Sequence, residues 1–167
     1  MFFRGRSTRN LDPKGRLMLP AEFRESLNAR GLSSPDLEPE DHVQIELQTQ
    51  PRFVLTTYDD CLVAYPWEDW MDMEAKFARL PNPSPKVRTF RRLFIGGAEV
   101  HCLDAQGRIR LSQDHRDYAG LDKEVAIIGL INRFELWNPE ILKRSMAEQK
   151  LDEISDELAA SGIDFAL

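Results

Sequence analysis

An internal repeat constrains this chain more than any other feature of its sequence. Shifted by 92 positions, residues 2–24 match 94–116, and shifted by 72 positions, residues 55–66 match 127–138. The difference between the two offsets places an insertion of 20 residues in the first copy, within 32–52. Two copies are too few for a solenoid, so the repeat predicts two similar units around a pseudo-twofold axis. The identical pairs at the first offset are Phe2/Phe94, Gly5/Gly97, Leu11/Leu103, Asp12/Asp104, Gly15/Gly107, Arg16/Arg108, Leu19/Leu111 and Arg24/Arg116.

Both copies predict one order of elements: a strand, a tight turn, a second strand, a short helix, a strand hairpin and a longer amphipathic helix. Prolines between 81 and 85 break the chain between the copies, and a short helix is expected after them. Beyond the strands at the two turns, the elements are expected at 21–28, 52–57, 61–65, 67–80, 87–94, 113–119, 124–130, 134–137 and 139–160.

This order predicts an α+β fold, with the short helices packed outside the strands. A first unit at 2–80 is expected to carry the insertion, and a second unit is expected at 96–142. Residues 81–95 are predicted to form a linker and short helix, and residues 143–167 an acidic helix or tail. The chain is long enough to bury one shared core.

The turns of the two copies share the pattern D-x-x-G-R, at 12–16 and 104–108. Asp12 and Asp104 are expected to accept hydrogen bonds from amides of their own turns, and Gly15 and Gly107 to adopt a positive φ. The pattern is typical of a three-residue hairpin loop with a bulge. These four residues are therefore assigned structural roles in the turns.

Basic residues on and beside these turns are the candidate DNA contacts: Arg16, Arg108, Lys14, Arg4, Arg6 and Arg110. Strand alternation points Arg108 and Arg110 outward while Ile109 points inward. An arginine fork suits phosphates and guanine edges. Two simpler interpretations stay open. Each turn arginine can serve only to pair with its aspartate, and the face carrying Arg4 and Arg6 can be an ordinary solvated surface.

Charge is distributed unevenly along the chain. The formal net charge is −6, which taken alone argues against nucleic acid. Residues 1–30, however, hold seven basic and three acidic residues, whereas residues 31–80 hold three basic and eleven acidic ones. The distribution of charge decides binding more than its total, so a molecule with one basic face is expected.

Other classes of protein find little support in the sequence. A membrane span and a secretory signal are not expected, and a cytoplasmic protein is the default. The histidines His42, His101 and His115 show no metal-ligand spacing with Cys61 or Cys102, so neither a metal nor a cofactor is predicted. Nucleophile, phosphate-loop and dinucleotide motifs are also lacking. We therefore predict that the chain is not an enzyme and has no small-molecule substrate.

With its repeat and its two D-x-x-G-R turns, the sequence resembles the MraZ family of bacterial regulators. These proteins are built from two SpoVT/AbrB-like swapped-hairpin units. The segments that carry the resemblance are 3–6, 11–24, 61–66, 103–109 and 121–125. The resemblance implies a pseudo-twofold β-barrel formed by both units within one chain. It also implies a nucleoid-associated repressor that acts as a ring-like homo-oligomer. Such a regulator binds direct repeats in double-stranded promoter DNA upstream of the division and cell-wall gene cluster, its own promoter included. Arg16, Arg108 and Lys14 match the family's DNA-contacting positions.

A protein-binding role is the alternative to DNA binding. Trp67, Trp70 and Trp137, with Met71 and Met73, can form an exposed docking surface, although their helical spacing more often marks a core. In a related alternative, the chain is an antitoxin whose acidic segment 152–164 neutralises a basic toxin. Recovery of one stoichiometric basic partner, without retention of promoter DNA, would favour this role.

Overall fold

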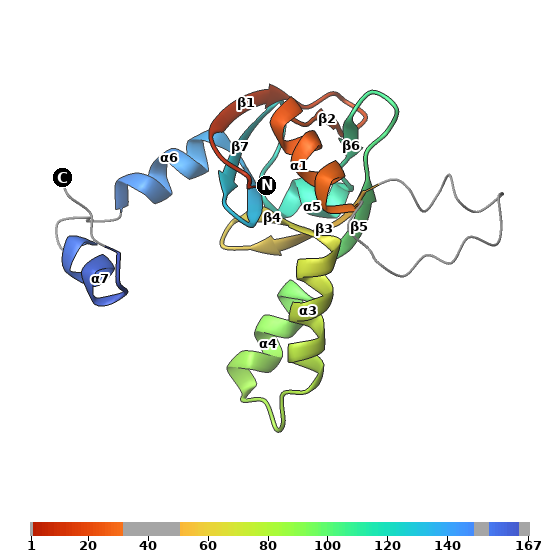
Figure 1. The fold of residues 1–167 in the computed structure, drawn as a ribbon. Coiled ribbons are helices and arrows are strands. Elements are labelled where there is room, and N and C mark those ends of the chain that lie inside the picture. The colour runs from red at the N-terminus through yellow and green to blue at the C-terminus, as the bar shows by residue number, and fades with distance from the viewer. Residues whose placement is uncertain (1, 32–50, 149–153, 164–167) are drawn as a thin grey trace, which may run out of the picture.

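A computed structural model of the chain describes residues 2–31, 51–148 and 154–163. It has the predicted α+β composition, with an antiparallel sheet, a strand ribbon and several helices (Figure 1). The predicted insertion lies outside the described residues except for 51 and 52. None of the helices in the described ranges is both long and apolar enough to cross a bilayer.

The elements follow the predicted order closely, and each predicted strand hairpin and short helix is confirmed. The expected helix at 139–160 is helical at both ends, while 149–153 lie outside the described residues. In chain order the elements are β1 (Arg6–Asn10), β2 (Arg16–Met18), α1 (Ala21–Gly31), β3 (Arg52–Tyr58), β4 (Cys61–Pro66), α3 (Trp67–Ala78), α4 (Pro85–Phe94), β5 (Glu99–Cys102), β6 (Arg108–Arg110), α5 (Gln113–Tyr118), β7 (Glu124–Leu130), β8 (Arg133–Trp137), α6 (Pro139–Glu148) and α7 (Ile154–Ala160).

The six-stranded sheet is assembled from strands of both copies, in the order β1-β7-β8-β4-β3-β5. The first strand of each copy pairs with a hairpin of the other copy, β1 with β7 and β5 with β3. At the centre, β4 pairs with its counterpart β8. The order therefore reads the same from both edges once each strand is replaced by its counterpart. Neither copy completes its sheet without the other.

The predicted barrel is not seen as a closed ring of hydrogen-bonded strands. Within the described residues, β1 and β5 are the two edges of the six-stranded sheet, and β2 and β6 form a separate two-stranded ribbon. β2 and β6 are only three residues long each. An isolated bridge between Leu11 and Leu17 is what joins β1 to β2.

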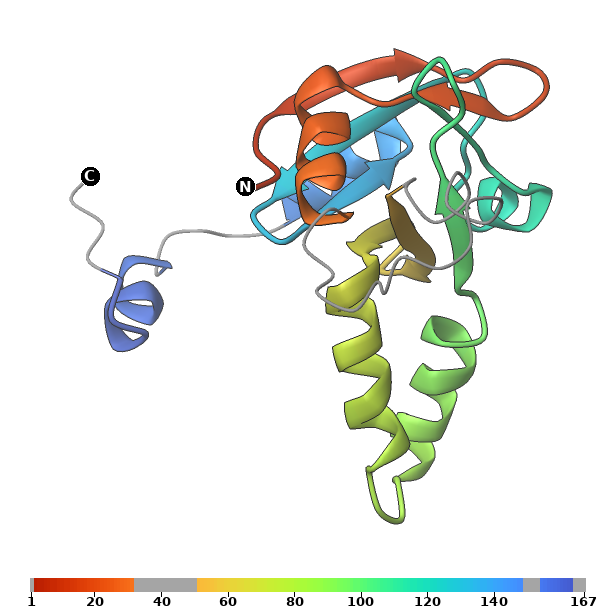
Figure 2. The same cartoon turned by 45° about the vertical axis from the view of Figure 1, so that its right-hand side comes forward.

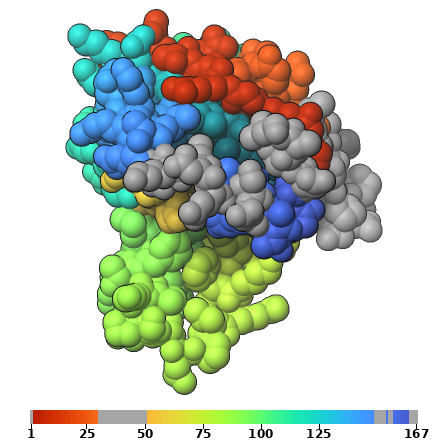
Figure 3. Space-filling view, turned by 90° about the vertical axis from the view of Figure 1, so that its left-hand side faces the viewer, coloured from red at the N-terminus to blue at the C-terminus, as the bar shows by residue number. Residues whose placement is uncertain are grey.

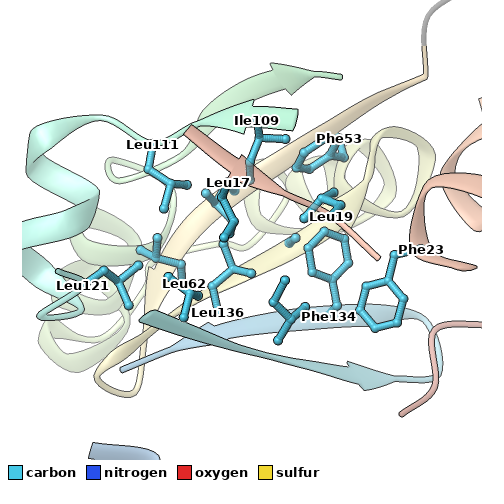
Figure 4. Packing of buried hydrophobic residues seen from close by; sticks show 14 of the residues in the cluster. Leu17, Leu19, Phe23, Phe53, Leu62, Ile109, Leu111, Leu121, Phe134 and Leu136 are labelled. Carbon is cyan, nitrogen blue, oxygen red and sulfur yellow. The ribbon is translucent and has the colours of Figure 1, made fainter. Parts of the chain in front are cut away.

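The main core lies between the ribbon and one face of the sheet (Figure 4). Leu17 and Ile109 point down from the ribbon, and Leu62 and Leu136 rise from the sheet below. All four side chains are at most 2% exposed. Full burial of one such side chain stabilises the fold by about 1.5–3 kcal/mol. This packing holds the short ribbon rigidly over the sheet even though few hydrogen bonds tie it down.

Helices α3 and α4 project from the sheet as a helical hairpin (Figures 2 and 3). An aromatic cluster holds them together, in which the rings of Trp70 and Phe94 stack at 5.5 Å. The hydroxyl of Thr57 donates to the carbonyl of Leu93 at 2.8 Å and ties the end of α4 to β3. Burial of Trp70 and Trp137, which are only 3% and 5% exposed, agrees with the core placement that their spacing favoured over the alternative of a docking surface. Packing against β3, β4 and α6 removes both rings from solvent.

Candidate nucleic-acid interface

The first D-x-x-G-R turn is held by a network centred on the carboxylate of Asp12. Its Oδ1 accepts hydrogen bonds from the backbone amides of Lys14 and Arg16 at 2.9 and 2.8 Å. Its Oδ2 accepts from Nε of Arg16 at 2.6 Å. The amide of Gly15 donates to the carbonyl of Asp12, and Gly15 has a φ of +76°. The predicted hydrogen bonds to Asp12 and the predicted positive φ of Gly15 are observed, and they fix the backbone from which the Arg16 side chain projects.

The second turn repeats this network with one added contact. Asp104 accepts from the amides of Gln106 and Arg108 at 2.9 Å each, and from Nε of Arg108 at 2.8 Å. In addition, Nη2 of Arg108 donates to Oε1 of Gln106 at 2.8 Å. In the first turn, the position of Gln106 is occupied by Lys14, which brings a further positive charge instead. The two turns thus have one backbone geometry and different side-chain restraint.

Ribbon pairing brings three of the candidate arginines onto one face. Arg16 lies opposite Arg110 across the ribbon, and Met18 lies opposite Arg108. Residues directly opposite each other in an antiparallel pair project from the same face. The inward Leu17 is fully buried, whereas the side chains of Arg16 and Arg108 are 39% and 29% exposed. Arginines separated by about ninety positions in sequence therefore share one solvent-facing surface, which we call the arginine face (Arg16, Arg108 and Arg110).

The arginine face is electrostatically suited to an anion. Like charges directly opposite each other on a ribbon destabilise it, and Arg16 faces Arg110. Asp12 offsets only part of this repulsion, because an exposed ion pair contributes about 0–1 kcal/mol. An anion bound between the two guanidinium groups relieves the repulsion, and charge-assisted bidentate hydrogen bonds favour a phosphate there.

Two further arginines support the turns from beneath, a role that the sequence analysis did not assign. Arg24 of α1 packs against the second turn, where its Cδ lies 2.5 Å from the point that a Cβ on Gly107 would occupy. Arg116 of α5 packs in the same way against Gly15 of the first turn, at 3.4 Å. Each helix thus braces the turn of the other copy. The identity of Arg24 and Arg116 at the 92-residue offset was the available signal.

The remaining candidates are exposed but lie apart from the arginine face or beside it. Lys14 is exposed at the tip of the first turn. Arg6 lies at the start of β1, where its Nη1 approaches Sδ of Met146 at 4.0 Å, and the guanidinium of Arg4 lies over the ring of Phe2. Six residues of extended chain, about 20 Å, separate Arg6 from Asp12. The structure brings Arg16, Arg108 and Arg110 together, and it does not bring Arg4 and Arg6 to them.

The turn carboxylates predict an acid-sensitive fold. Hydrogen bonds from the amides and guanidinium groups of Arg16 and Arg108 hold the pKa values of Asp12 and Asp104 below the ordinary 3.8. Because the folded chain binds these protons less readily than the unfolded chain, the stabilisation is complete above about pH 4 and is lost as the pH falls through the lowered values. We expect the double variant Asp12→Asn/Asp104→Asn to lose less stability than the wild type over this range. Urea unfolding at a series of pH values measures it, and parallel curves would refute the linkage.

Comparison with known sequences identifies the family to which the chain belongs. A family model described as "MraZ protein, putative antitoxin-like" matches residues 94–162, which include the second turn. The protein named Transcriptional regulator MraZ of Oleidesulfovibrio alaskensis is 50% identical over 167 residues, and the alignment covers 100% of both chains. The chain belongs to the MraZ family.

Other MraZ proteins match along nearly the same length. The Transcriptional regulator MraZ of Nitratidesulfovibrio vulgaris strain Hildenborough is 49% identical over 165 residues, with 99% of each chain covered. The namesake protein of Acidithiobacillus ferrooxidans is 42% identical over 136 residues, with 81% of this chain and 82% of its own covered. MraZ proteins are named as transcriptional regulators, and the expectation that the chain is not an enzyme is confirmed.

Proposed function

We propose that this MraZ family member is a DNA-binding transcriptional regulator whose arginine face contacts double-stranded DNA. The observation that carries the proposal is the pairing of β2 with β6, which joins Arg16, Arg108 and Arg110 on one rigid surface. The major groove of B-DNA is wide enough to admit a two-stranded β-ribbon. Guanidinium groups on the outer face of such a ribbon reach guanine edges or flanking phosphates. The two half-buried turns supply the rigidity that such contacts need.

The proposed mechanism begins with exchange of partners at the turn. In the free protein, Asp12 and Asp104 pair with Arg16 and Arg108 and so hold these arginines in one orientation beside their turns. Since these pairs are half-exposed and weak, a phosphate displaces the carboxylate at little cost. Backbone hydrogen bonds from each turn to its aspartate persist, so the turn itself keeps its shape.

We further propose that several copies of the chain act together. With a formal net charge of −6, one chain gains little from long-range attraction to DNA. A ring-like homo-oligomer presents several arginine faces, and linked weak sites gain about 100- to 10,000-fold in avidity when their spacing fits. This assembly suits direct repeats in a promoter. Repression of the division and cell-wall gene cluster, including the chain's own promoter, from a cytoplasmic, nucleoid-associated position is part of the same proposal. The same proposal includes a swapped-hairpin barrel as the unit that carries each arginine face.

A gel-shift with the DNA upstream of the chain's own gene tests this function. We expect retardation at concentrations of protein that leave a scrambled fragment of equal length and composition free. Specific binding exceeds non-specific binding by about a thousandfold or more in such regulators. Equal affinity for both fragments would contradict the proposal. Recovery of one stoichiometric basic protein, with no retention of DNA, would instead favour the antitoxin-like role that the family description names.

A further inference from the structure

A cluster of two histidines and a glutamate lies away from the arginine face, on β5 and α5. Glu99 and His101 are two residues apart on β5 and project from the same face of the strand, and His115 of α5 packs against them. Oε2 of Glu99 lies 3.6 Å from Nε2 of His101 and 3.6 Å from Nδ1 of His115. The three donor atoms all lie within 4.8 Å of one another. Spacing in the sequence did not predict this group, because the fold brings α5 onto β5.

Both ring nitrogens that face the glutamate are buried and have no hydrogen-bond partner among the described residues. The side chains of His101 and His115 are 10% and 3% exposed, so water does not compensate freely for the missing partners. Leaving a buried polar atom unsatisfied destabilises the folded chain. Two such atoms aimed at one carboxylate oxygen indicate that a cation belongs between them.

The hydrogen bonding of His115 settles which of its nitrogens is available. Its Nε2 lies 2.7 Å from the backbone carbonyl oxygen of Gly97. A carbonyl only accepts hydrogen bonds, so Nε2 carries a proton, and Nδ1 is the ring nitrogen available to a metal ion. Nδ1 lies 3.6 Å from a carboxylate oxygen, so a cation held between the two atoms would be favourable. A ligating histidine typically donates its other N–H to a backbone carbonyl in this way.

We propose that Glu99, His101 and His115 bind a divalent transition-metal ion, with zinc the best fit to the donor set. Two imidazole nitrogens and one carboxylate oxygen are ligands that zinc accepts in sites with one open position. Ligand atoms about 2.0–2.2 Å from a tetrahedral ion are about 3.3–3.6 Å apart, so the two 3.6 Å contacts of Glu99 already fit. The two histidine nitrogens lie within 4.8 Å of each other, and binding would draw them together where they exceed this range.

The surroundings of the cluster are also those of a metal site. Oε1 of Glu99 accepts a hydrogen bond from the hydroxyl of Ser112 at 2.7 Å, which orients the carboxylate. The ring of Phe53 stacks on His101 at 5.8 Å and restricts its rotation. Glu99 and His115 also line an open pocket of about 320 Å³ beside the cluster.

The internal repeat shows that the fold itself does not require this cluster. At the 92-residue offset, the counterparts of Glu99, His101 and His115 in the first copy are Ser7, Arg9 and Phe23. Phe23 is 3% exposed and packs in the main core, so an apolar ring fills the equivalent place in that copy. The polar cluster is thus found in the second copy and not in the first. This is expected of residues that bind a ligand, whereas residues needed for packing the fold would recur in both copies.

Zinc titration of the full chain, freed of metal by a chelator, tests the proposal. Isothermal titration calorimetry is expected to show one saturable zinc ion per chain and a rise in melting temperature with added zinc. Glu99→Gln keeps the Ser112 hydrogen bond, and His115→Phe installs the residue of the first copy. Each variant is expected to weaken binding by more than the roughly 10- to 100-fold typical of outer-shell changes. Glu99→Gln remains informative if His115→Phe does not fold.

Two variants serve as matched controls. Cys102→Ser removes an exposed thiol that strand alternation directs away from His101, and His42→Asn removes the remaining histidine of the chain. Both are expected to bind zinc like the wild type. Loss of binding in either control but not in Glu99→Gln would overturn the assignment. Failure of the wild type to bind zinc saturably would also overturn it.

Discussion

Replacing Gly15 with valine is expected to destabilise the fold by about 2–6 kcal/mol, which is a large part of the total for a domain of this size. The φ of +76° is strained for any β-branched residue. A Cβ at this position would also lie 2.7 Å from the carbonyl oxygen of Leu111, which is backbone and cannot move aside. The amide of Leu111 donates to the carbonyl of Gly15 at 2.7 Å. The steric clash would therefore disrupt a backbone contact between the two copies. Chemical denaturation followed by circular dichroism measures the loss.

Gly5 provides the matched control for this prediction. Its φ of +85° is equally unusual, but a Cβ there would have nothing within 4 Å. Gly5→Val therefore carries the backbone strain alone, about 1–3 kcal/mol. If Gly5→Val and Gly15→Val lower the free energy of unfolding by the same amount, then the close approach between the copies is not the reason that Gly15 must be glycine. Wild-type stability in Gly15→Val would refute the role of the turn altogether.

Replacing Arg16 with alanine is expected to weaken binding to the upstream DNA by roughly 5- to 150-fold, since one bidentate base contact is worth about 1–3 kcal/mol. Arg108→Ala is expected to weaken it less, because Gln106 and Asp104 both hold the Arg108 guanidinium and restrict its reach. Both variants are expected to fold, since Arg16→Ala loses one half-exposed ion pair and Arg108→Ala loses one such pair and an exposed hydrogen bond to Gln106. Fluorescence anisotropy with labelled DNA gives the affinities, and circular dichroism checks the fold.

Arg79→Ala is the control for a general loss of positive charge. Arg79 is exposed at the end of α3, on the helical hairpin that projects from the sheet. Its removal lowers the net charge by the same amount as Arg16→Ala but leaves the arginine face intact. A comparable loss of affinity in Arg79→Ala would mean that total charge, rather than the ribbon, decides binding.

Local features of this fold were accessible from sequence because their causes are local. The network around Asp12 involves residues at most four positions apart, so the pattern D-x-x-G-R was enough to predict it. The burial of Leu17 and Ile109 beside exposed arginines followed from strand alternation.

Features that depend on contacts between the copies were not accessible in this way. The offset of 92 identified equivalent residues, but it did not predict that Arg16 would pair with Arg110 across the ribbon. The support of each turn by Arg24 or Arg116 and the grouping of Glu99 with two histidines depend on how helices pack on strands. The resemblance to MraZ implied a closed barrel, whereas hydrogen bonding in the described residues leaves the sheet and the ribbon separate.

The salt dependence of DNA binding tests the arginine face most directly. The logarithm of the binding constant for the upstream fragment should fall linearly with the logarithm of salt concentration, by about 0.9 per phosphate neutralised. We predict a slope for Arg16→Ala/Arg108→Ala that is shallower than that of the wild type by about one for each phosphate that the variant no longer neutralises. An unchanged slope together with unchanged affinity would contradict the proposal that these two arginines bind DNA.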